Sequence, residues 1–543
     1  MIVSILDYGS GNVRSLVNAV KYLGYETEWI RDPAKVEDAE CLIFPGVGNF
    51  GFVCDSLKEQ GYFEPIRKYL ASGKPFMAVC VGIQALFEGS TESPSSEGLG
   101  IFKGFVEKFD TQTKTVPHIG WNSCAVRSDL THEYYGLRPH SKYYYVHSYM
   151  LPANKLSIPT EFKVATTVYE GEEFIGAIMK KNFFATQFHP EKSGLAGLHC
   201  LSSFLSGAFA VPIDGLASRL NETAVGGLTK RIIACLDVRS NDAGDLVVTK
   251  GDQYDVREKS AAGSEVRNMG KPVELCERYF KEGADEVTFL NITSFRNCPL
   301  RDSPMLAVLE KSAETVFVPL TVGGGIRDIT DPDGTFHPAL EVAGLYFRSG
   351  ADKVSIGSDS VYAAEQYYQN GKTLTGKTAI ETISKAYGNQ AVVISVDPKR
   401  HYVDNPSVTS HHCVETSRVG PKGEKYAWYQ CTVKGGREYR DLDVIQLVQA
   451  CEVMGAGEIL LNCMDQDGSN SGYDIELIRS VKQAVSIPVI ASSGAGIPEH
   501  FEQVFNETNC DAALAAGIFH RQTCSIADVK KHLEKTGILV REA

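Results

Sequence analysis

The second part of the chain contains an internal repeat. Two short apolar segments end in aspartate, IIACLD at Asp237 and VVISVD at Asp397. Each is followed, in the same order, by three further segments that match between the halves: GADEVTFLN with GAGEILLNC, VPLTVGGGI with IPVIASSGAGI, and GADKVSIGS with NCDAALAAGIF. Gly-Ala strand starts occur in many α/β proteins, but four matches in one order favour a true repeat. Two four-strand halves predict a (β/α)8 TIM barrel over residues 229–543.

The first part of the chain alternates short apolar segments with helical patterns, for example MIVSILDYG, CLIFPGVGN and PFMAVC. Such runs suit parallel strands that are buried on both faces. We therefore expect an α/β domain over residues 1–205, with an open, mostly parallel sheet and flanking helices. Residues 206–228 are rich in Gly, Ser, Ala and Asn, which predicts a connector. The polar segments 240–270 and 400–438 do not fit the repeat, and we expect long loops at the C-terminal face of the barrel.

Composition restricts the kinds of partner. The chain has 54 lysines and arginines against 67 aspartates and glutamates, a formal net charge of −13. Such a chain is a poor candidate for binding nucleic acid or an anionic membrane through its overall field. No apolar run approaches the roughly 20 residues of a membrane span, and the N-terminus MIVSILDYGSGN lacks the basic segment of a secretory signal. We expect a cytoplasmic protein.

The fourteen cysteines are scattered, and none forms a CxxC pair. In a chain of this length they predict reduced, buried thiols and not a disulfide framework. We expect no metal site and no cofactor.

One cysteine lies where a reactive thiol would be expected. In PFMAVCVGIQALFEG an apolar strand leads through Cys80 and Gly82 into a helix. A sharp strand-to-helix turn exposes its central residue, and a helix N-terminus favours a thiolate. By itself the pattern fits a buried structural cysteine equally well.

A second motif supplies the missing partners of such a thiol. ATQFHPEKSG places His189 and Glu191 just after an apolar strand. A nucleophilic cysteine needs a base, and the base needs a carboxylate to orient it. Alone, this motif would be a solvated turn, but together with Cys80 it predicts a catalytic triad.

These motifs resemble the class I, triad-type glutamine amidotransferase family. The resemblance implies that Cys80 attacks the side-chain amide of glutamine, that His189 protonates the leaving ammonia, and that water then releases glutamate. In this family PGVGN supplies the oxyanion hole and YVHS lies beside the glutamine pocket. The common elbow has glycine two residues before the cysteine, and here Ala78 stands there. The implied oxyanion and glutamine-binding residues are Gly46, Val47, Gly48, Asn49, Gln84, Tyr145, His147 and Ser148.

In the barrel, Asp237 ends the first strand and Asp397 ends the fifth. The two strands lie on opposite sides of a barrel, and strand ends face its active mouth. Two carboxylates across a pocket suit general acid and general base catalysis. A single strand-end aspartate would more often cap the following loop, but the symmetric pair favours chemistry.

Glycine-rich turns follow the third, fourth, seventh and eighth strands. Glycine lets a backbone approach an anion closely, and the last two strands carry the usual phosphate site of such barrels. The half-barrel symmetry predicts a second phosphate site opposite, although a steric need for glycine would explain any one turn. The residues concerned are Gly324, Gly325, Gly357, Ser358, Ser493, Gly494, Ala516 and Gly517.

This part resembles the cyclase barrel of the imidazole glycerol phosphate synthase family, and the whole chain resembles its fused, eukaryotic type. The matching segments include RIIACLDV, VVTKGDQ, TVGGGI, VVISVDPKR and GEILLNCMDQDGSNSGYD. The resemblance implies that PRFAR reacts with ammonia to give imidazole glycerol phosphate and AICAR, with Asp237 and Asp397 as the acid/base pair. It adds Lys250, Gln390, Asn462, Asp467 and Gly468 as substrate-binding residues.

Four barrel strands begin at or beside a charged residue: Arg231, Glu286, Lys353 and Glu458. Strand starts lie at the bottom of a barrel, so these side chains could form a closed ring of ion pairs. Such a ring could be merely structural. The family resemblance implies instead an ammonia gate, with the glutaminase docked on the bottom face.

Two other interpretations remain open at this point. A phosphosugar isomerase of the same two-phosphate barrel type could carry an unrelated hydrolase. A binding or regulatory protein with degenerate sites would also share the fold, although such copies usually lose at least one catalytic residue. With both functions in one chain, no partner subunit is required, and we expect a monomer.

Overall fold

The N-terminal domain is built on a seven-stranded sheet in the order β11-β12-β13-β4-β3-β1-β2. The strands from β13 to β2 are parallel to their neighbours, while β12 and β11 are antiparallel additions at one edge. The computed structural model describes residues 1–9, 11–213, 227–241, 246–249, 257–260, 263–266, 268–292 and 300–542. The strands are β1 Ile2–Leu6, β2 Glu26–Ile30, β3 Cys41–Phe44, β4 Phe76–Val79, β11 Lys163–Tyr169, β12 Glu172–Lys180 and β13 Phe183–Thr186.

Helices and short strand pairs cover this sheet. Both faces are buried because alternate residues of a strand enter opposite cores: Cys41 and Ile43 pack with α1 and α5, whereas Leu42 and Phe44 pack with α2 and α3. The helices are α1 Arg14–Tyr22, α2 Phe50–Glu59, α3 Phe63–Ala71, α4 Val81–Gln84 and α5 Gly194–Leu205. The short strands are β5 Gly89–Ser90, β6 Phe105–Lys108, β7 His118–Ser123, β8 His132–Tyr134, β9 Lys142–His147, β10 Tyr149–Met150 and β14 Ala210–Pro212.

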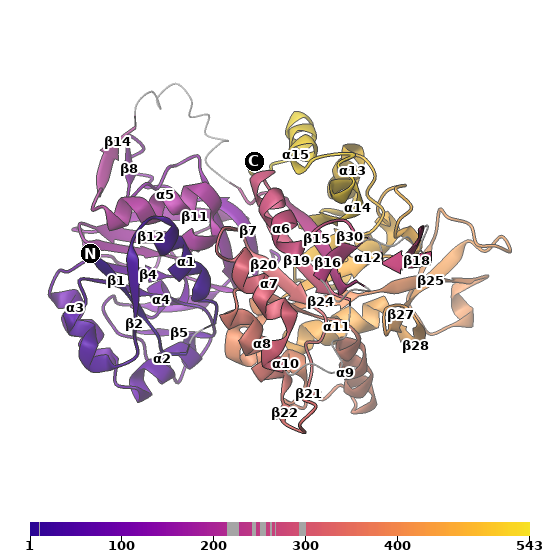
Figure 1. Ribbon diagram of the computed structural model, residues 1–543, viewed down its shortest axis with the longest axis horizontal. Helices are drawn as coiled ribbons and strands as arrows, with labels where there is room; N and C mark the ends of the chain where they lie inside the picture. The colour runs from indigo at the N-terminus through magenta and orange to yellow at the C-terminus, as the bar shows by residue number, and fades with distance from the viewer. Residues whose placement is uncertain are drawn as a thin grey trace.

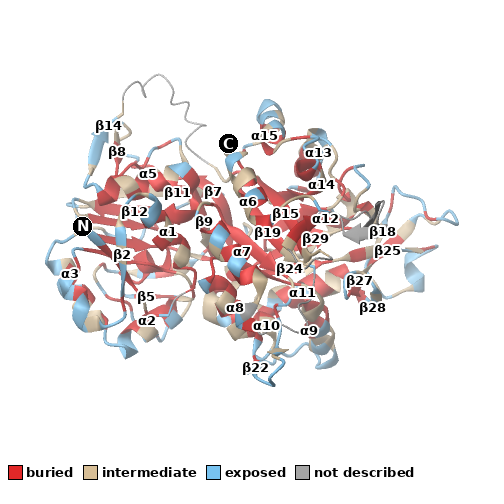
Figure 2. Cartoon of the chain, viewed as in Figure 1, coloured by how far each residue is buried: buried red, intermediate tan, exposed pale blue. Residues whose placement is uncertain are grey.

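The C-terminal domain is a closed barrel of parallel strands, as the repeat predicts. Its strands follow one another in chain order, and β15 pairs with β31 to close the ring. The buried interiors of both domains appear in red in Figure 2. The strands are β15 Arg231–Ser240, β19 Glu286–Asn291, β20 Leu320–Gly323, β23 Lys353–Ile356, β24 Val392–Val396, β29 Glu458–Asn462, β30 Val489–Ser492 and β31 Ala512–Ala515.

Helices surround this barrel. Their apolar faces pack on the outside of the strands in one continuous core. The helices are α6 Pro272–Lys281, α7 Pro304–Ser312, α8 Ala339–Arg348, α9 Ser358–Gln369, α10 Ala379–Tyr387, α11 Val444–Met454, α12 Ile475–Ala484, α13 Pro498–Thr508, α14 Gly517–His520 and α15 Ile526–Lys535.

The segment expected as a loop at 400–438 is instead a small antiparallel sheet. It extends from the barrel on the side away from the N-terminal domain (Figure 1). Its central strand β27 pairs with all three others and is rich in aromatic and β-branched residues, which favour strands. The strands are β25 Pro398–Val403, β26 Cys413–Glu415, β27 Tyr426–Val433 and β28 Glu438–Asp443.

The other expected loop, 240–270, also contains strands. Strand β16 Leu246–Thr249 lies antiparallel to the end of β15, and β17 Arg257–Ser260 pairs with β18 Gly263–Val266. The short hairpin β21 Ile329–Thr330 with β22 Phe336–His337 follows the third barrel strand.

The two domains lie side by side (Figure 1). The predicted connector 206–228 begins within the first domain, because β14 pairs with β8. Residues 214–226 lie outside the described residues. No helix among the described residues is long and apolar enough to cross a membrane. The cysteines of the described part are free thiols, and all but Cys413 are buried.

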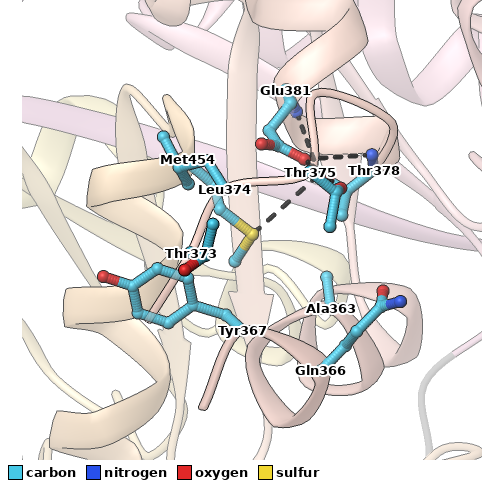
Figure 3. A pocket seen from close by; sticks show the side chains of 9 residues that line it. All are labelled: Ala363, Gln366, Tyr367, Thr373, Leu374, Thr375, Thr378, Glu381 and Met454. Carbon is cyan, nitrogen blue, oxygen red and sulfur yellow. Dashed lines mark hydrogen bonds between the residues drawn. The ribbon is translucent and has the colours of Figure 1, made fainter. Parts of the chain in front are cut away.

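Helix α10 begins with a capping box, which Figure 3 shows beside the small hollow between α9, α10 and α11. The Thr378 hydroxyl accepts the Glu381 backbone N–H at 3.2 Å, and the Glu381 carboxylate accepts the Thr378 backbone N–H at 3.1 Å. The Thr375 hydroxyl donates to the same carboxylate at 3.0 Å. These bonds satisfy backbone donors that a helix start leaves without partners.

We expect Thr378→Ala to lower barrel stability by about 1 kcal/mol, because the cap is lost. Thr373→Ala is the matched control, since Thr373 is exposed on the preceding loop. Calorimetric unfolding of both variants measures the difference. Equal midpoints for the two variants would contradict the role of the cap.

Candidate active sites

Cys80 lies at a sharp turn between β4 and the short helix α4. Its backbone has φ 51° and ψ −111°, a sparsely populated conformation for a residue with a side chain. Its N–H donates to the carbonyl of Thr186, at the end of the neighbouring strand β13, at 2.7 Å. The structure therefore contains the expected elbow, with the thiol held where two parallel strands end.

His189 and Glu191 meet beside this elbow. The Nδ1 atom of His189 is 2.8 Å from Oε1 of Glu191, and both side chains are buried. Burial lowers the pKa of His189, but the adjacent Cys80 and Glu191 raise it more, so the net pKa lies well above its ordinary value. The protonated, cationic form of the His189 imidazole is thereby favoured. The structure thus brings all three predicted residues together.

The predicted oxyanion segment packs directly against the elbow. A Cβ on Gly46 would come within 2.1 Å of the Gly82 nitrogen, so only glycine permits this approach. Gly48 has φ 131°, which residues with side chains rarely adopt. Asn49 is the N-cap of α2 and accepts one of its backbone N–H groups at 3.2 Å. Gly46 therefore lies against the turn that carries the thiol, and Val47, Gly48 and Asn49 follow it in the chain.

The predicted glutamine-pocket residues Tyr145 and His147 are bonded inside the protein. The Tyr145 hydroxyl is 2.6 Å from Thr167 Oγ1. The two ring nitrogens of His147 lie 2.7 Å from the Tyr149 carbonyl and 3.2 Å from His118 Nδ1. Burial lowers the pKa of His147 to about 3, so it is neutral. Their side-chain polar atoms are thus used within the protein, and their place beside a glutamine pocket stays a prediction.

Gln84 and Ser148 also bond to protein groups. The Nε2 atom of Gln84 donates to the Tyr149 carbonyl at 2.9 Å and to Oε1 of Gln187 at 3.0 Å. The Ser148 hydroxyl donates to Asn389 Oδ1 of the barrel domain at 2.8 Å. Ser148 is therefore a contact between the two domains.

Sequence reasoning missed Glu92, which lies beside Asn49. Its Oε2 atom accepts the Phe50 backbone N–H at 2.8 Å. Burial raises the Glu92 pKa to about 7, although hydrogen bonds from Phe50 and Asn49 lower it in part. A carboxyl group that titrates near neutral pH therefore adjoins the predicted oxyanion segment.

The barrel mouth encloses a cavity of about 1380 Å³ that both aspartates line. Asp237 Oδ1 lies 3.6 Å from Cys235 Sγ, and Asp397 Oδ1 accepts from Asn462 Nδ2 at 3.1 Å. The cavity is also lined by the predicted residues Gly324, Gly325, Gly357, Ser358, Asn462, Asp467, Gly468, Ser493, Gly494, Ala516 and Gly517. The structure thus gathers the carboxylates and both sets of glycine-rich turns around one space.

Cationic side chains that sequence reasoning missed line the same cavity. They are Arg239, Arg327, Lys434, Arg437 and Arg521. The Arg521 guanidinium lies against the last glycine turn, because a Cβ on Gly517 would be 2.9 Å from its Nη2. Backbone N–H groups of a glycine turn beside a guanidinium suit a phosphate.

The predicted substrate residue Gln390 does not join this set. Gln390 lies in the short helix Asn389–Ala391, before β24, so it is at the opposite end of that strand from Asp397. This corrects its expected place at the mouth and puts it near the domain interface. Lys250 lies outside the described residues.

The four predicted gate residues form a closed, fully buried ring. Arg231 pairs with Glu458 and lies 3.1 Å from Glu286, while Lys353 Nζ lies 2.8 Å from Glu286 and 2.7 Å from Glu458. Thr321 adds a hydroxyl donor to Glu286 at 2.6 Å. Burial raises the pKa of Glu458, but Arg231 and Lys353 lower it more. Each carboxylate thus has two cationic partners, as a buried charge requires.

The N-terminal domain docks around this ring. Lys192 Nζ and Asn12 Nδ2 reach the Asp352 carboxylate at 2.7 and 2.8 Å. Trp121 Nε1 donates to the Asp285 carbonyl at 3.2 Å, and Arg541 lies 4.2 Å above the indole ring. The N-terminal domain therefore lies at the starts of the barrel strands, which is the bottom face on which the sequence predicts that it docks.

The high pKa of Glu92 predicts that its burial destabilises the folded protein to an extent that depends on pH. The Glu92 carboxyl has a pKa of about 7 in the folded chain and about 4.3 in the unfolded chain. The free energy of unfolding therefore falls as pH rises through that interval. We expect Glu92→Gln, which keeps an acceptor for Phe50, to gain up to about 3.5 kcal/mol over the parent at pH 8.5 and little at pH 4.

Urea unfolding at both pH values measures this difference. Glu97→Gln is the matched control, because its side chain is 76% exposed and its removal should have the same small effect at each pH. An equal effect of Glu92→Gln at pH 4 and pH 8.5 would refute the burial argument.

Among the described residues, no cluster of three or more His, Cys, Asp or Glu side chains could hold a metal ion. Two family models match the chain. The model for glutamine amidotransferase class-I matches residues 4–206, and the model for histidine biosynthesis protein matches residues 231–525.

Relatives match over the whole chain. An imidazole glycerol phosphate synthase hisHF of Schizosaccharomyces pombe is 76% identical over 541 residues, covering 100% of both chains. That of Emericella nidulans is 62% identical, covering 99% of this chain and 98% of its own. A chloroplastic one of Arabidopsis thaliana is 50% identical, covering 99% and 89%. Matches of this length, with both domains in one order, do not support an isomerase joined to an unrelated hydrolase. The chain belongs to the imidazole glycerol phosphate synthase hisHF family, a bifunctional enzyme of glutamine amidotransferase and cyclase domains.

Proposed function

We propose that the N-terminal domain hydrolyses glutamine through Cys80, His189 and Glu191. The Cys80 thiolate attacks the carboxamide, His189 passes a proton to the leaving ammonia, and Glu191 orients the imidazole. Water then releases glutamate from the thioester. The buried 2.8 Å contact between His189 and Glu191 beside the strained elbow supports these roles.

The barrel converts PRFAR and ammonia into imidazole glycerol phosphate and AICAR. Asp237 and Asp397 line one cavity from opposite strands, which suits them as general acid and base for ring closure and cleavage. The glycine turns after β20 and β23, and after β30 and β31, would hold the two phosphates. The observation that supports this proposal is that both aspartates and both sets of glycine turns line one cavity.

Ammonia travels between the two sites through the barrel. The ring of Arg231, Glu286, Lys353 and Glu458 stands at the bottom, next to the docked domain, and the cavity stands at the top. Between them lies an apolar cluster of the barrel interior, in which Ile233, Val393, Leu460 and Ile490 pack together. Neutral ammonia crosses such a core at a low cost, whereas water outside would protonate it.

The fused relatives support a chain that needs no separate subunit. We propose that it works as a monomer on glutamine and PRFAR, without a cofactor. Its place in the cytoplasm stays a prediction, because the plant relative is named chloroplastic.

Replacing the nucleophile tests whether ammonia is the shared intermediate. We expect Cys80→Ala to lose PRFAR turnover with glutamine, because no thioester can form, and to keep turnover with ammonium salt at high pH. Product formation with each nitrogen source is the measurement. Asp397→Asn is the matched control, expected to lose turnover with both sources by about 100-fold or more while the glutaminase site stays intact. Loss of both activities in Cys80→Ala would reopen the assignment of the first domain.

The gate is tested through the coupling ratio. Lys353→Met leaves two buried carboxylates with Arg231 as their remaining partner, so the ring should open or shift. We expect more glutamate than imidazole product per turnover, measured by assaying both in one reaction. Lys311→Met removes an exposed lysine that pairs with Glu314 and should leave the ratio near one. An unchanged ratio in Lys353→Met would show that the ring is only structural.

A further inference from the structure

One buried glutamine touches the proposed nucleophile. Gln187 follows β13 directly and is completely buried. Its Nε2 atom lies 3.6 Å from Cys80 Sγ, within hydrogen-bond distance for sulfur. Its backbone N–H donates to the Gly176 carbonyl at 2.8 Å, which anchors the residue to β12.

The strand arrangement fixes this contact. Strands β4 and β13 are parallel neighbours, with Val79 opposite Thr186. Cys80 and Gln187 are therefore the next residues on the two chains, and the Cys80 N–H bonds to the Thr186 carbonyl at 2.7 Å. The amide thus meets the sulfur at the place where the elbow is held to the sheet.

A chain of bonds determines which atom of Gln187 faces the sulfur. The Tyr149 backbone carbonyl can only accept, so the Gln84 atom 2.9 Å from it must be the amide nitrogen. The same nitrogen lies 3.0 Å from Gln187, whose facing atom must be the carbonyl oxygen Oε1. The other end of the Gln187 amide, the N–H donor, therefore points at Cys80.

A donor in this position distinguishes the two forms of the sulfur. A thiol is a weak acceptor, and a buried amide N–H with so weak a partner would be costly. A thiolate is a strong acceptor, because hydrogen bonds to ionised groups are about twice as strong as neutral ones. Burial of Gln187 excludes water from the bond and strengthens it further.

We propose that Gln187 is a positioning residue for glutamine hydrolysis: its amide N–H holds Cys80 Sγ as a thiolate aimed at the substrate, with the amide locked by Gln84 and the Tyr149 carbonyl. The proposal rests on the role of Cys80 as nucleophile. Gln187 and His189 act in different ways. His189 accepts and returns the proton, whereas Gln187 stabilises the sulfur without exchanging a proton.

The pH dependence of Cys80 alkylation tests this role in the full-length protein. Iodoacetamide reacts with the thiolate, and peptide mass spectrometry separates Cys80 from the other cysteines. In Gln187→Leu we expect the rate at neutral pH to fall about tenfold and the midpoint of the pH profile to move up by about one unit, with a similar plateau at high pH. Gln187→Glu keeps the shape and the acceptor for Gln84 but turns an oxygen toward the sulfur, so its midpoint should move further.

Thr186→Val is the matched control. It removes a buried hydroxyl one residue from Gln187, and that hydroxyl donates to the Phe188 carbonyl and not to the sulfur. The midpoint of its alkylation profile should therefore match that of the parent. Calorimetric unfolding of each variant reports folding, because turnover with ammonium salt would report on the barrel alone. If Gln187→Leu fails to fold, Gln187→Glu carries the test alone.

Two results would overturn the proposal. An unmoved midpoint in the folded Gln187 variants, with rates lowered equally at every pH, would mean that Gln187 only packs the elbow. Wild-type protein that kept glutamine-dependent turnover after complete alkylation of Cys80 would refute the nucleophile itself, and the role of Gln187 with it.

Discussion

The ring of two cations and two carboxylates at the barrel bottom is the constraint around which the two domains are arranged. Buried charges are tolerated only when each is paired, and here each of the four contacts two of opposite sign. Two ring members have an acidic neighbour in the chain that serves docking. Asp285, before Glu286, bonds to Trp121 through its carbonyl, and Asp352, before Lys353, pairs with Lys192. Each of these two strand-start dipeptides thus contributes one residue to the ring and one contact to the other domain.

The proposed oxyanion segment is held between the elbow and the barrel. Gly46 leaves room for the elbow, and a Cβ on Gly48 would come within 3.3 Å of the Ala386 carbonyl in α10. The bond from Ser148 to Asn389 joins the domains nearby. The glutaminase-like site therefore includes the barrel surface in its surroundings, and a shift of α10 would reach it by direct contact.

Sequence alone predicted the residues whose place follows from topology. Cys80 and Asp397 directly follow strands and Asp237 lies near the end of β15, so parallel order brings them to a known edge, whereas Arg231 and Lys353 start strands at the opposite edge. Contacts between side chains on different elements were not predictable in this way. The bonds of His147 to His118 and of Gln84 to Gln187 depend on packing that no local pattern encodes. Gln187 itself had a signal, because it stands only two residues before His189 in the sequence.

The barrel core also constrains what can pass from one site to the other. An ammonium ion would have to leave water and cross an interior that is in large part apolar, at a cost of several kcal/mol. The ring adds no compensation, since its two positive and two negative charges balance. Neutral ammonia meets neither penalty. The proposed glutaminase site would have to release ammonia while the domains are docked, because a molecule protonated in open water would lose both its nucleophilicity and its route.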